Sequence, residues 1–297
     1  MKNQKLPILI LVLLFGATFH DAYGQARNCP SADYDCQIAE YSKALKADPR
    51  NIEAYYDLAL AFQNKGRFKE AVEIYSMYIA APVQDRKYLA DGYNNRAVSL
   101  RKLGKHEQAL EDLTKAIELN PNNAEFITNR GNTYRDLRNF DLALAEYDKA
   151  IAVEPAYASA YIGRGSVNDL KGNATQALKD FSKAIRIDPK GAEAYYNRAG
   201  IHFAKRDYAK AIPDYDKYIK LNTSNIAYLA DGYINRGIAH FYTGSAEAAV
   251  RDLSQAIKLQ PADDRAYKAR AFIYRDMKKT ALAEADEKKA AELQSPK

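Results

Sequence analysis

The sequence has no tryptophan, two cysteines and four histidines among its 297 residues. The two cysteines, Cys29 and Cys36, are too few for a disulfide-rich scaffold, and no histidine lies near them to complete a metal site. The chain also lacks a Gly-x-Ser-x-Gly elbow, a phosphate-binding Gly-Lys-Ser/Thr loop and a His-Glu-x-x-His pair. These absences predict a chain that is not an enzyme and uses no catalytic residue, metal ion or cofactor.

Charge of one sign is not concentrated anywhere in the sequence. The 44 lysines and arginines are interleaved with 38 acidic residues, as on an ordinary solvated helical surface. A nucleic-acid partner needs a basic stripe, so the sequence argues against one. With 47% hydrophobic residues, the chain is too apolar for general disorder.

An apolar run near the N-terminus, residues 6–15, would extend about 15 Å as a helix, half of what a bilayer core requires. Two lysines precede it, and residues 22–24 place small side chains where a signal peptidase cleaves. We therefore expect residues 1–24 to be a signal peptide cleaved after Gly24, with an uncleaved anchor as the alternative. The mature chain would be periplasmic or secreted, with no integral membrane span. Since no Leu-x-x-Cys precedes Cys29, a lipid anchor is not expected.

In an exported chain, Cys29 and Cys36 predict a disulfide that closes a short loop; the alternative is two free thiols in a disordered tail. Residues 25–51 are expected to form an N-terminal cap, made of this loop and half of the repeat unit described next.

A unit of 34 residues recurs along the rest of the chain. Position 8 of the unit is always Ala or Gly, position 20 is always Ala, and positions 4 and 24 are mostly Tyr, Phe or Leu. Apolar residues at such spacings lie on one face of a helix. Four units place a glycine between two such faces, where a helix end needs positive φ: Gly66, Gly104, Gly172 and Gly244. Each unit is therefore predicted to be a pair of antiparallel helices.

This pattern resembles the tetratricopeptide repeat (TPR). The resemblance implies an all-α fold, an α-solenoid in the form of a right-handed superhelix of about seven TPR helical hairpins plus an N-terminal half-repeat. The expected units span residues 52–294, as 52–89, 90–123, 124–157, 158–191, 192–229, 230–263 and 264–294. The resemblance also implies a concave groove lined mainly by the first helix of each hairpin.

Two units depart from the regular spacing. The unit that starts at Ile52 and the unit that starts at Ala192 are 38 residues long, and the string Tyr-Leu-Ala-Asp-Gly-Tyr spans the end of each, at residues 88–93 and 228–233. Four residues are about one helical turn, so we expect the next helix to be one turn longer at its start in both places. The two exceptions are 140 residues apart, which indicates a duplicated block of four units. Pro213 is expected to bend the helix that contains it.

Six units carry Arg at position 7 and an acid at position 23, and the first unit lacks both, with Leu58 and Ile74 instead. One interpretation is a row of arginines for an acidic ligand. Because the first unit lacks the arginine and the acid together, the sequence favours the other interpretation, a structural ion pair between the two helices of each hairpin. The expected pairs are Arg96 with Asp112, Arg130 with Glu146, Arg164 with Asp180, Arg198 with Asp214, Arg236 with Asp252, and Arg270 with Asp286.

The resemblance implies that positions 2, 5, 6, 9 and 12 face the groove. They are polar or basic in units 2 and 3 and largely apolar in units 5 to 7, and four units carry Asn at position 6. An amide there can bind a peptide backbone, or bond within its own repeat instead. The apolar residues would form a binding surface unless the next helix covers them. The candidate groove residues are Asn94, Asn95, Arg101, Asn129, Asn132, Arg135, Tyr196, Asn197, Phe203, Ile234, Asn235, Ile238, Phe241 and Phe272.

The sequence thus predicts an exported bacterial TPR protein. Its expected role is a protein-interaction scaffold that holds a partner segment in the groove, within a cell-envelope or secretion assembly. The alternative is a carrier or guide for an anionic cell-envelope polysaccharide, which would use Arg101, Arg135 and the tyrosines. Self-association into a structural assembly is a third hypothesis.

Overall fold

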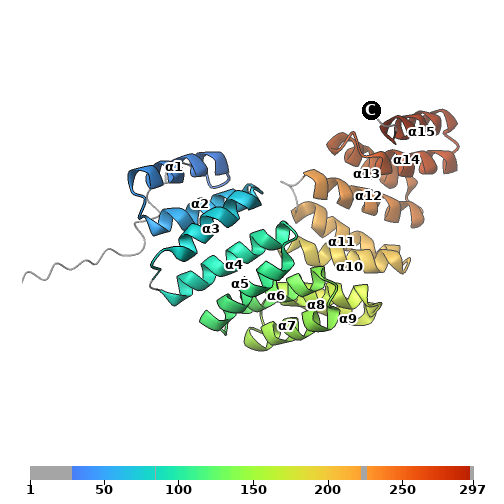
Figure 1. The fold of residues 1–297 in the computed structure, drawn as a ribbon. Helices are drawn as coiled ribbons and strands as arrows, with labels where there is room; N and C mark the ends of the chain where they lie inside the picture. The colour runs from blue at the N-terminus through green and yellow to red at the C-terminus, as the bar shows by residue number, and fades with distance from the viewer. Residues whose placement is uncertain (1–28, 84, 222–225, 295–297) are drawn as a thin grey trace, which may run out of the picture. The chain divides into compact units, whose positions relative to one another are not determined.

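The computed structural model describes residues 29–294 apart from 84 and 222–225, and every regular element among them is a helix. The predicted signal peptide and its cleavage site lie outside the described residues. The chain divides after Leu119 into two compact units. Each is a stack of antiparallel helical hairpins, which confirms the predicted all-α solenoid class (Figure 1).

The first unit contains the half-repeat and two hairpins. Its helices are α1 (Tyr34–Ala47), α2 (Ile52–Asn64), α3 (Phe68–Ala80), α4 (Arg86–Lys102) and α5 (His106–Leu119). Helix α1 packs on α2 through Ile38, Tyr41 and Leu45, which contact a buried cluster that includes Leu58 and Tyr75. The half-repeat therefore covers the apolar side of the first hairpin.

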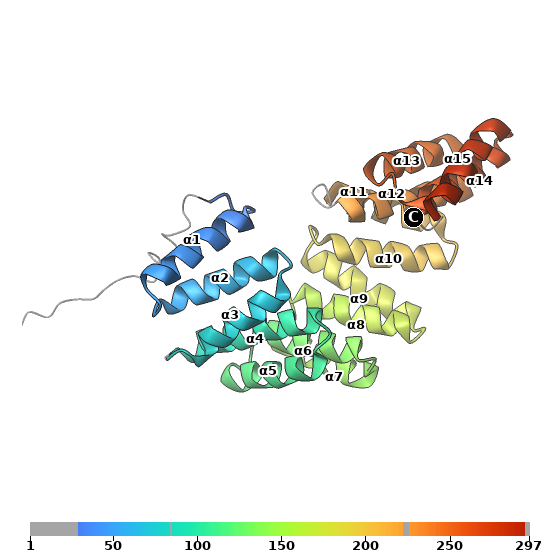
Figure 2. The same cartoon turned by 45° about the horizontal axis from the view of Figure 1, so that its top comes forward.

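The second unit contains five hairpins. Their helices are α6 (Ala124–Asp136), α7 (Phe140–Val153), α8 (Ala158–Leu170), α9 (Ala174–Ile187), α10 (Ala192–Ala204), α11 (Tyr208–Leu221), α12 (Ile226–Tyr242), α13 (Ala246–Leu259), α14 (Asp264–Asp276) and α15 (Thr280–Gln294). Successive hairpins lie side by side in both views (Figure 2).

Small residues let the two helices of a hairpin approach each other. Ala177 on α9 has no exposed surface, and a Cβ on Gly165 of α8 would lie 2.9 Å from the Phe181 ring. Phe181 fills the space that these small residues leave, and it packs against Ile201 of the next hairpin. Large rings at position 24 therefore join one hairpin to the next, which is how a repeat too small to fold alone gains a core.

The expected longer helices are confirmed. Helices α4 and α12 have 17 residues, whereas the first helix of every other complete hairpin has 13. Their extra turn lies at the start, before Ala90 and Ala230. Helix α11 runs through Pro213 without ending there.

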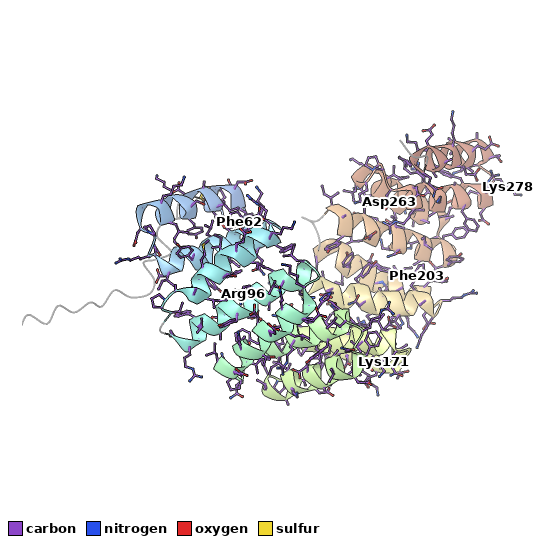
Figure 3. The ribbon with its side chains drawn as sticks, viewed as in Figure 1. Phe62, Arg96, Lys171, Phe203, Asp263 and Lys278 are labelled. Atoms are coloured by element: carbon purple, nitrogen blue, oxygen red, sulfur yellow. A yellow bond between two sulfur atoms is a disulfide. The ribbon has the colours of Figure 1, made fainter. Side chains whose placement is uncertain are left out.

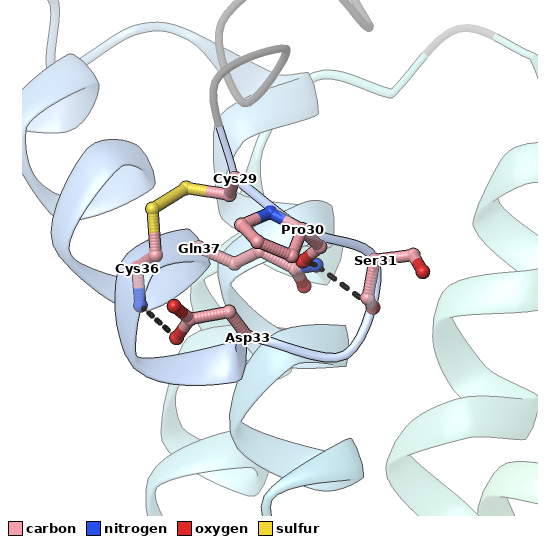
Figure 4. Close-up of a disulfide and its surroundings, with 6 residues drawn as sticks. All are labelled: Cys29, Pro30, Ser31, Asp33, Cys36 and Gln37. Carbon is pink, nitrogen blue, oxygen red and sulfur yellow. Dashed lines mark hydrogen bonds between the residues drawn. A yellow bond between two sulfur atoms is a disulfide. The ribbon is translucent and has the colours of Figure 1, made fainter.

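The N-terminal loop is closed by a disulfide between Cys29 and Cys36 (Figure 4). The Asp33 side chain accepts a hydrogen bond of 3.0 Å from the Cys36 amide, which caps α1. The side-chain amide of Gln37 donates through Nε2 to the Ser31 carbonyl at 3.2 Å. Side-chain hydrogen bonds and the disulfide thus hold the start of α1, which has no buried residue of its own.

Candidate partner-binding site

Each arginine at position 7 is paired with the acid at position 23 of its own hairpin. The arginine donates through Nε and Nη2 to the carboxylate at 2.7–3.1 Å. The six acids, Asp112, Glu146, Asp180, Asp214, Asp252 and Asp286, are all buried. The acid side chains lie inside the hairpins and accept from Nε and Nη2 of the arginine guanidinium groups. This geometry favours the structural interpretation over a row of ligand-binding arginines.

Five of the six arginines also bond to the preceding hairpin, which the sequence reasoning missed. The Nη1 of Arg198 donates to Ser182 Oγ at 3.0 Å, and the Nη1 of Arg164 donates to Asp148 at 2.6 Å. The acceptor is position 25 of the preceding unit in every such case; the others are Ser76, Asp216 and Ser254. The recurrence of Ser or Asp at position 25 was the available signal.

Two residues predicted to face a partner are buried instead. Ile234 is 5% exposed and lies in a cluster with Leu253 of α13 and Ile273 of α14. Asn94 is 2% exposed and donates to Asn95 Oδ1 at 3.2 Å. Position 5 is covered here because the neighbouring helices pack over it, so both residues belong to the core.

The asparagines at position 6 are half-buried, and two of them bond within the array. Asn95 donates to the Tyr56 hydroxyl at 2.8 Å, and Asn235 donates to the Tyr196 hydroxyl at 3.2 Å. Tyr196 is one of the predicted groove residues, and its ring packs against Tyr215 and Tyr218. These amides connect consecutive first helices, so each bonds to the preceding repeat and not within its own.

The side chains of the remaining polar candidates are half-buried. Asn132 Oδ1 accepts a hydrogen bond of 2.8 Å from the buried Tyr147 hydroxyl. Arg135 lies 3.3 Å from Asp136. The other three candidates, Arg101, Asn129 and Asn197, are half-buried as well.

Three of the apolar candidates in the second unit belong to a continuous row of five rings, called here the aromatic ladder: Phe203, Tyr208, Tyr242, Phe241 and Phe272. The sequence reasoning missed the two tyrosines. Ring centroids are 5.2 Å apart for the first pair, 4.7 Å for the stacked tyrosines, 5.4 Å for the third pair and 5.5 Å for the last. Tyr242 and Phe272 are 55% and 58% exposed. Helices α10, α11, α12 and α14 each contribute, so only the folded stack brings these rings together.

The other block of the duplication shows that the stack does not need these rings. The residues 140 positions earlier are Gln63, Phe68, Lys102, Arg101 and Asn132, of which only one is aromatic. Gln63 accepts a hydrogen bond of 3.0 Å from Tyr75, the counterpart of Tyr215. The same fold positions therefore accept polar side chains, which points to a role for the ladder outside packing. Ile238, another predicted residue, lies half-buried against the Ile234 cluster.

No group of three or more His, Cys, Asp or Glu side chains in the described part of the chain is arranged to hold a metal ion. Within the same residues, no helix combines the length and apolarity needed to cross a membrane.

Stacked helical hairpins define a repeat scaffold, a class that is generally not enzymatic and that typically binds protein partners. Sequence models of the tetratricopeptide repeat match residues 34–66, 53–81, 90–123, 128–192, 171–226 and 230–263. The chain belongs to the tetratricopeptide-repeat family.

A curated relative, a TPR repeat-containing protein of Methanocaldococcus jannaschii, is 33% identical over 89 residues. The match spans 30% of this chain and 28% of the length of that relative. Among solved structures, a TPR protein of Parabacteroides merdae is 21% identical, with a TM-score of 0.61 over 86% of this chain and 96% of its own. YrrB, described as a TPR protein with an unusual peptide-binding site, is 24% identical, with a TM-score of 0.55 over 62% of this chain and 93% of its own. These structural likenesses concern the fold.

Proposed function

We propose that this chain is an exported scaffold that binds an extended segment of a partner protein along the aromatic ladder, within a cell-envelope or secretion assembly. The observation that carries the proposal is the ladder itself, a row of rings with two members more than half exposed. Rigid aromatic side chains supply large contact area at low entropic cost and dominate binding energy in protein interfaces. The unusual peptide-binding site of YrrB is consistent with such use of the fold.

A half-buried amide supports the same proposal. Asn197 stands at the position where Asn95 and Asn235 also occur, and an amide can donate to and accept from a backbone at once. An extended segment fixed by its side chains on the ladder would therefore find a backbone partner on α10.

A photo-crosslinking amino acid placed at Phe272 tests where the partner binds, and the same probe at Leu142 is its control. Both side chains are exposed and apolar, at 58% and 51%, but Leu142 lies on α7 away from the ladder. In the cells that make this protein, we expect a discrete protein adduct from position 272 and none from position 142. A synthetic peptide of the crosslinked segment should then bind the purified chain.

The matched ladder variant combines Phe203→Gln with Phe272→Asn, which installs the residues of the other block. We expect it to fold as the parent does and to bind that peptide at least about tenfold more weakly, since each truncated aromatic anchor commonly costs more than 1 kcal/mol. If this variant binds the peptide with unchanged affinity, the proposal is wrong.

The alternative, a carrier for an anionic envelope polysaccharide, rests on Arg101 and Arg135, both half-buried on predicted groove positions. It predicts that position 272 yields no protein adduct, and that the purified chain binds an anionic polysaccharide with a steep salt dependence.

Export is part of the proposal and has its own test. The pattern of residues 1–24 and the bridged pair Cys29 and Cys36 support an oxidising destination. The mature protein should start at Gln25 and fractionate with the periplasm or the medium. Recovery of the intact chain in the cytoplasmic fraction would contradict export.

A further inference from the structure

Three turns between the helices of a hairpin hold a basic residue in the left-handed region of backbone conformation. Arg138, Arg206 and Lys278 have φ of 60°, 61° and 59°. The other four hairpins use glycine at this position, with φ between 75° and 83°. An L-residue with a side chain is strained there and glycine is not, so each of these three basic residues carries a local conformational cost.

Arg206 and Lys278 lie in turns that follow helices carrying ladder rings. Arg206 stands between two of its rings in the chain, Phe203 and Tyr208, and its amide donates to the Phe203 carbonyl at 2.9 Å. Lys278 lies in the turn that follows α14, the helix that carries Phe272. Figure 3 shows Phe203 and Lys278 on the same side of the second unit, at the ends of the hairpins.

Within the part of the chain that the structure describes, the basic side chains of these two turns have no ion-pair partner. Lys205, Arg206, Lys278 and Lys279 are exposed, and none of them forms an ion pair with another described residue. The turns also contain two acids, Asp207 and Asp276, and Asp207 already contacts Lys210 at 3.4 Å. The turns that follow two of the ladder helices, α10 and α14, therefore carry a net positive charge.

We propose that the ladder recognises an acidic protein segment, in which aromatic or aliphatic side chains that pack on the rings alternate with carboxylates that pair with Arg206 and Lys278. This inference rests on the proposed function, because it assigns the chemistry of the partner at the same surface. Phenylalanine makes up three of the five rings and offers no hydroxyl for a sugar, which favours a protein segment over an anionic polysaccharide.

Glycine substitution separates the binding role of these residues from a structural one. Arg206→Gly with Lys278→Gly removes the charge and relieves the backbone, so the thermal midpoint should stay the same or rise. Arg138→Gly is the control, because it makes the same kind of change once, one strained turn relieved and one positive charge removed, in a turn that carries no ladder ring.

The probes are three pools of synthetic twelve-residue peptides, in which Phe, Tyr and Leu alternate with Asp and Glu, with Asn and Gln, or with Lys and Arg. The acidic pool should bind the full mature chain at least about fivefold more tightly than the amide pool, and the basic pool most weakly. The double glycine variant should lose that preference and keep its affinity for the amide pool, and Arg138→Gly should behave as the parent.

Equal binding of the acidic and amide pools, or an unchanged preference in the double glycine variant, overturns the acidic assignment and leaves the proposed function standing. Failure of all pools to bind, or binding that survives the Phe203→Gln, Phe272→Asn variant, removes the proposed function as well. Binding of polygalacturonate that requires Arg206 and Lys278 but not the rings would replace the protein segment with a polysaccharide.

Discussion

Arg164 and Asp180 form a two-point ion pair inside one hairpin, with Nε and Nη2 of the arginine 3.1 and 2.7 Å from the two carboxylate oxygens. The Asp180 side chain is 3% exposed, and the hydrogen bonds to it raise the pKa of Arg164 above its ordinary value. Leaving either charge without its partner is costly in such a site, whereas an apolar pair can replace both. The first hairpin already does so with Leu58 and Ile74.

We expect Arg164→Leu to lower the free energy of unfolding by roughly 3 kcal/mol, because it leaves the buried Asp180 carboxylate without its arginine. Asp180→Ile should cost less, because Arg164 is partly exposed and keeps its ion pair with Asp148 at 2.6 Å. The double variant should lose far less than the sum. Urea denaturation of the four proteins measures the coupling. The exposed pair of Lys171 and Asp141 is the control, with a coupling of about 1 kcal/mol or less. Effects at 164 and 180 that simply add would mean that the pair does not contribute as a unit.

Asp57 provides a pH-dependent test of the first hairpin. Burial raises the pKa of Asp57 from 3.8 to about 6, and the negative charge of Glu53 adds to the shift. A carboxyl whose folded pKa lies above its unfolded value destabilises the fold once it ionises. The cost is absent below about pH 4, grows between pH 4 and 6, and is complete above that window.

Asp57→Asn should therefore stabilise the protein by about 1–2 kcal/mol at pH 7, after allowance for solvent screening, and have little effect at pH 4. The counterpart 140 residues later is already Asn197, which likewise follows a glutamate by four residues, Glu193. Asn197→Asp should thus lower stability at pH 7. Thermal unfolding at both pH values measures the difference; equal shifts at pH 4 and 7 would contradict the assignment to ionisation.

Most of the fold could be predicted because it depends on local patterns that recur. Hairpin periodicity, the extra turn of α4 and α12, and the partners of the six arginines all follow from spacing within one unit or between adjacent units. The failures concern surfaces formed by neighbouring helices. Position 5 lies where groove and core meet, so whether Asn94 or Ile234 is exposed depends on how the next helices pack.

The candidate site could be predicted only in part, for the same reason. Phe203, Phe241 and Phe272 stand at repeat positions that the family resemblance assigns to the groove. Tyr208 and Tyr242 stand at positions next to the turns, outside that assignment, and their stacking at 4.7 Å requires contact between α11 and α12. The left-handed conformation of Arg206 is likewise a property of the folded turn, although the absence of glycine there was visible in the sequence.

The disulfide supports a prediction about the N-terminal cap. Helix α1 buries none of its residues fully, so the bridge from Cys29 to Cys36 and the Asp33 cap hold its first turn. Replacing both cysteines by serine should destabilise the cap by roughly 2 kcal/mol in the chain-entropy description of a short loop. Hydrogen exchange should then accelerate in residues 34–47 ahead of α2. Unchanged exchange in α1 would show that its packing on α2 is sufficient.

Two glycines in first helices, Gly163 and Gly200, should respond in opposite directions to the same substitution. A Cβ on Gly163 would overlap the ring of Tyr147, whereas a Cβ on Gly200 would meet no atom within 4 Å. Tyr147 cannot move aside easily, because it is fully buried and its hydroxyl donates to Asn132 at 2.8 Å. Gly163 is thus required by the close approach of α8 to this ring, and Gly200 is not required by any contact.

Gly163→Ala should therefore lower the free energy of unfolding by about 1–3 kcal/mol, the usual cost of overpacking a well-filled core. Gly200→Ala should raise it by up to about 1 kcal/mol, since alanine favours the helix and finds open space. Urea denaturation of both variants beside the parent gives the two signs directly. Destabilisation by both would indicate that α10 packs more tightly around Gly200 than its open surroundings imply. Stabilisation by both would mean that the Tyr147 ring has room to yield, and that Gly163 does not set the spacing between these hairpins.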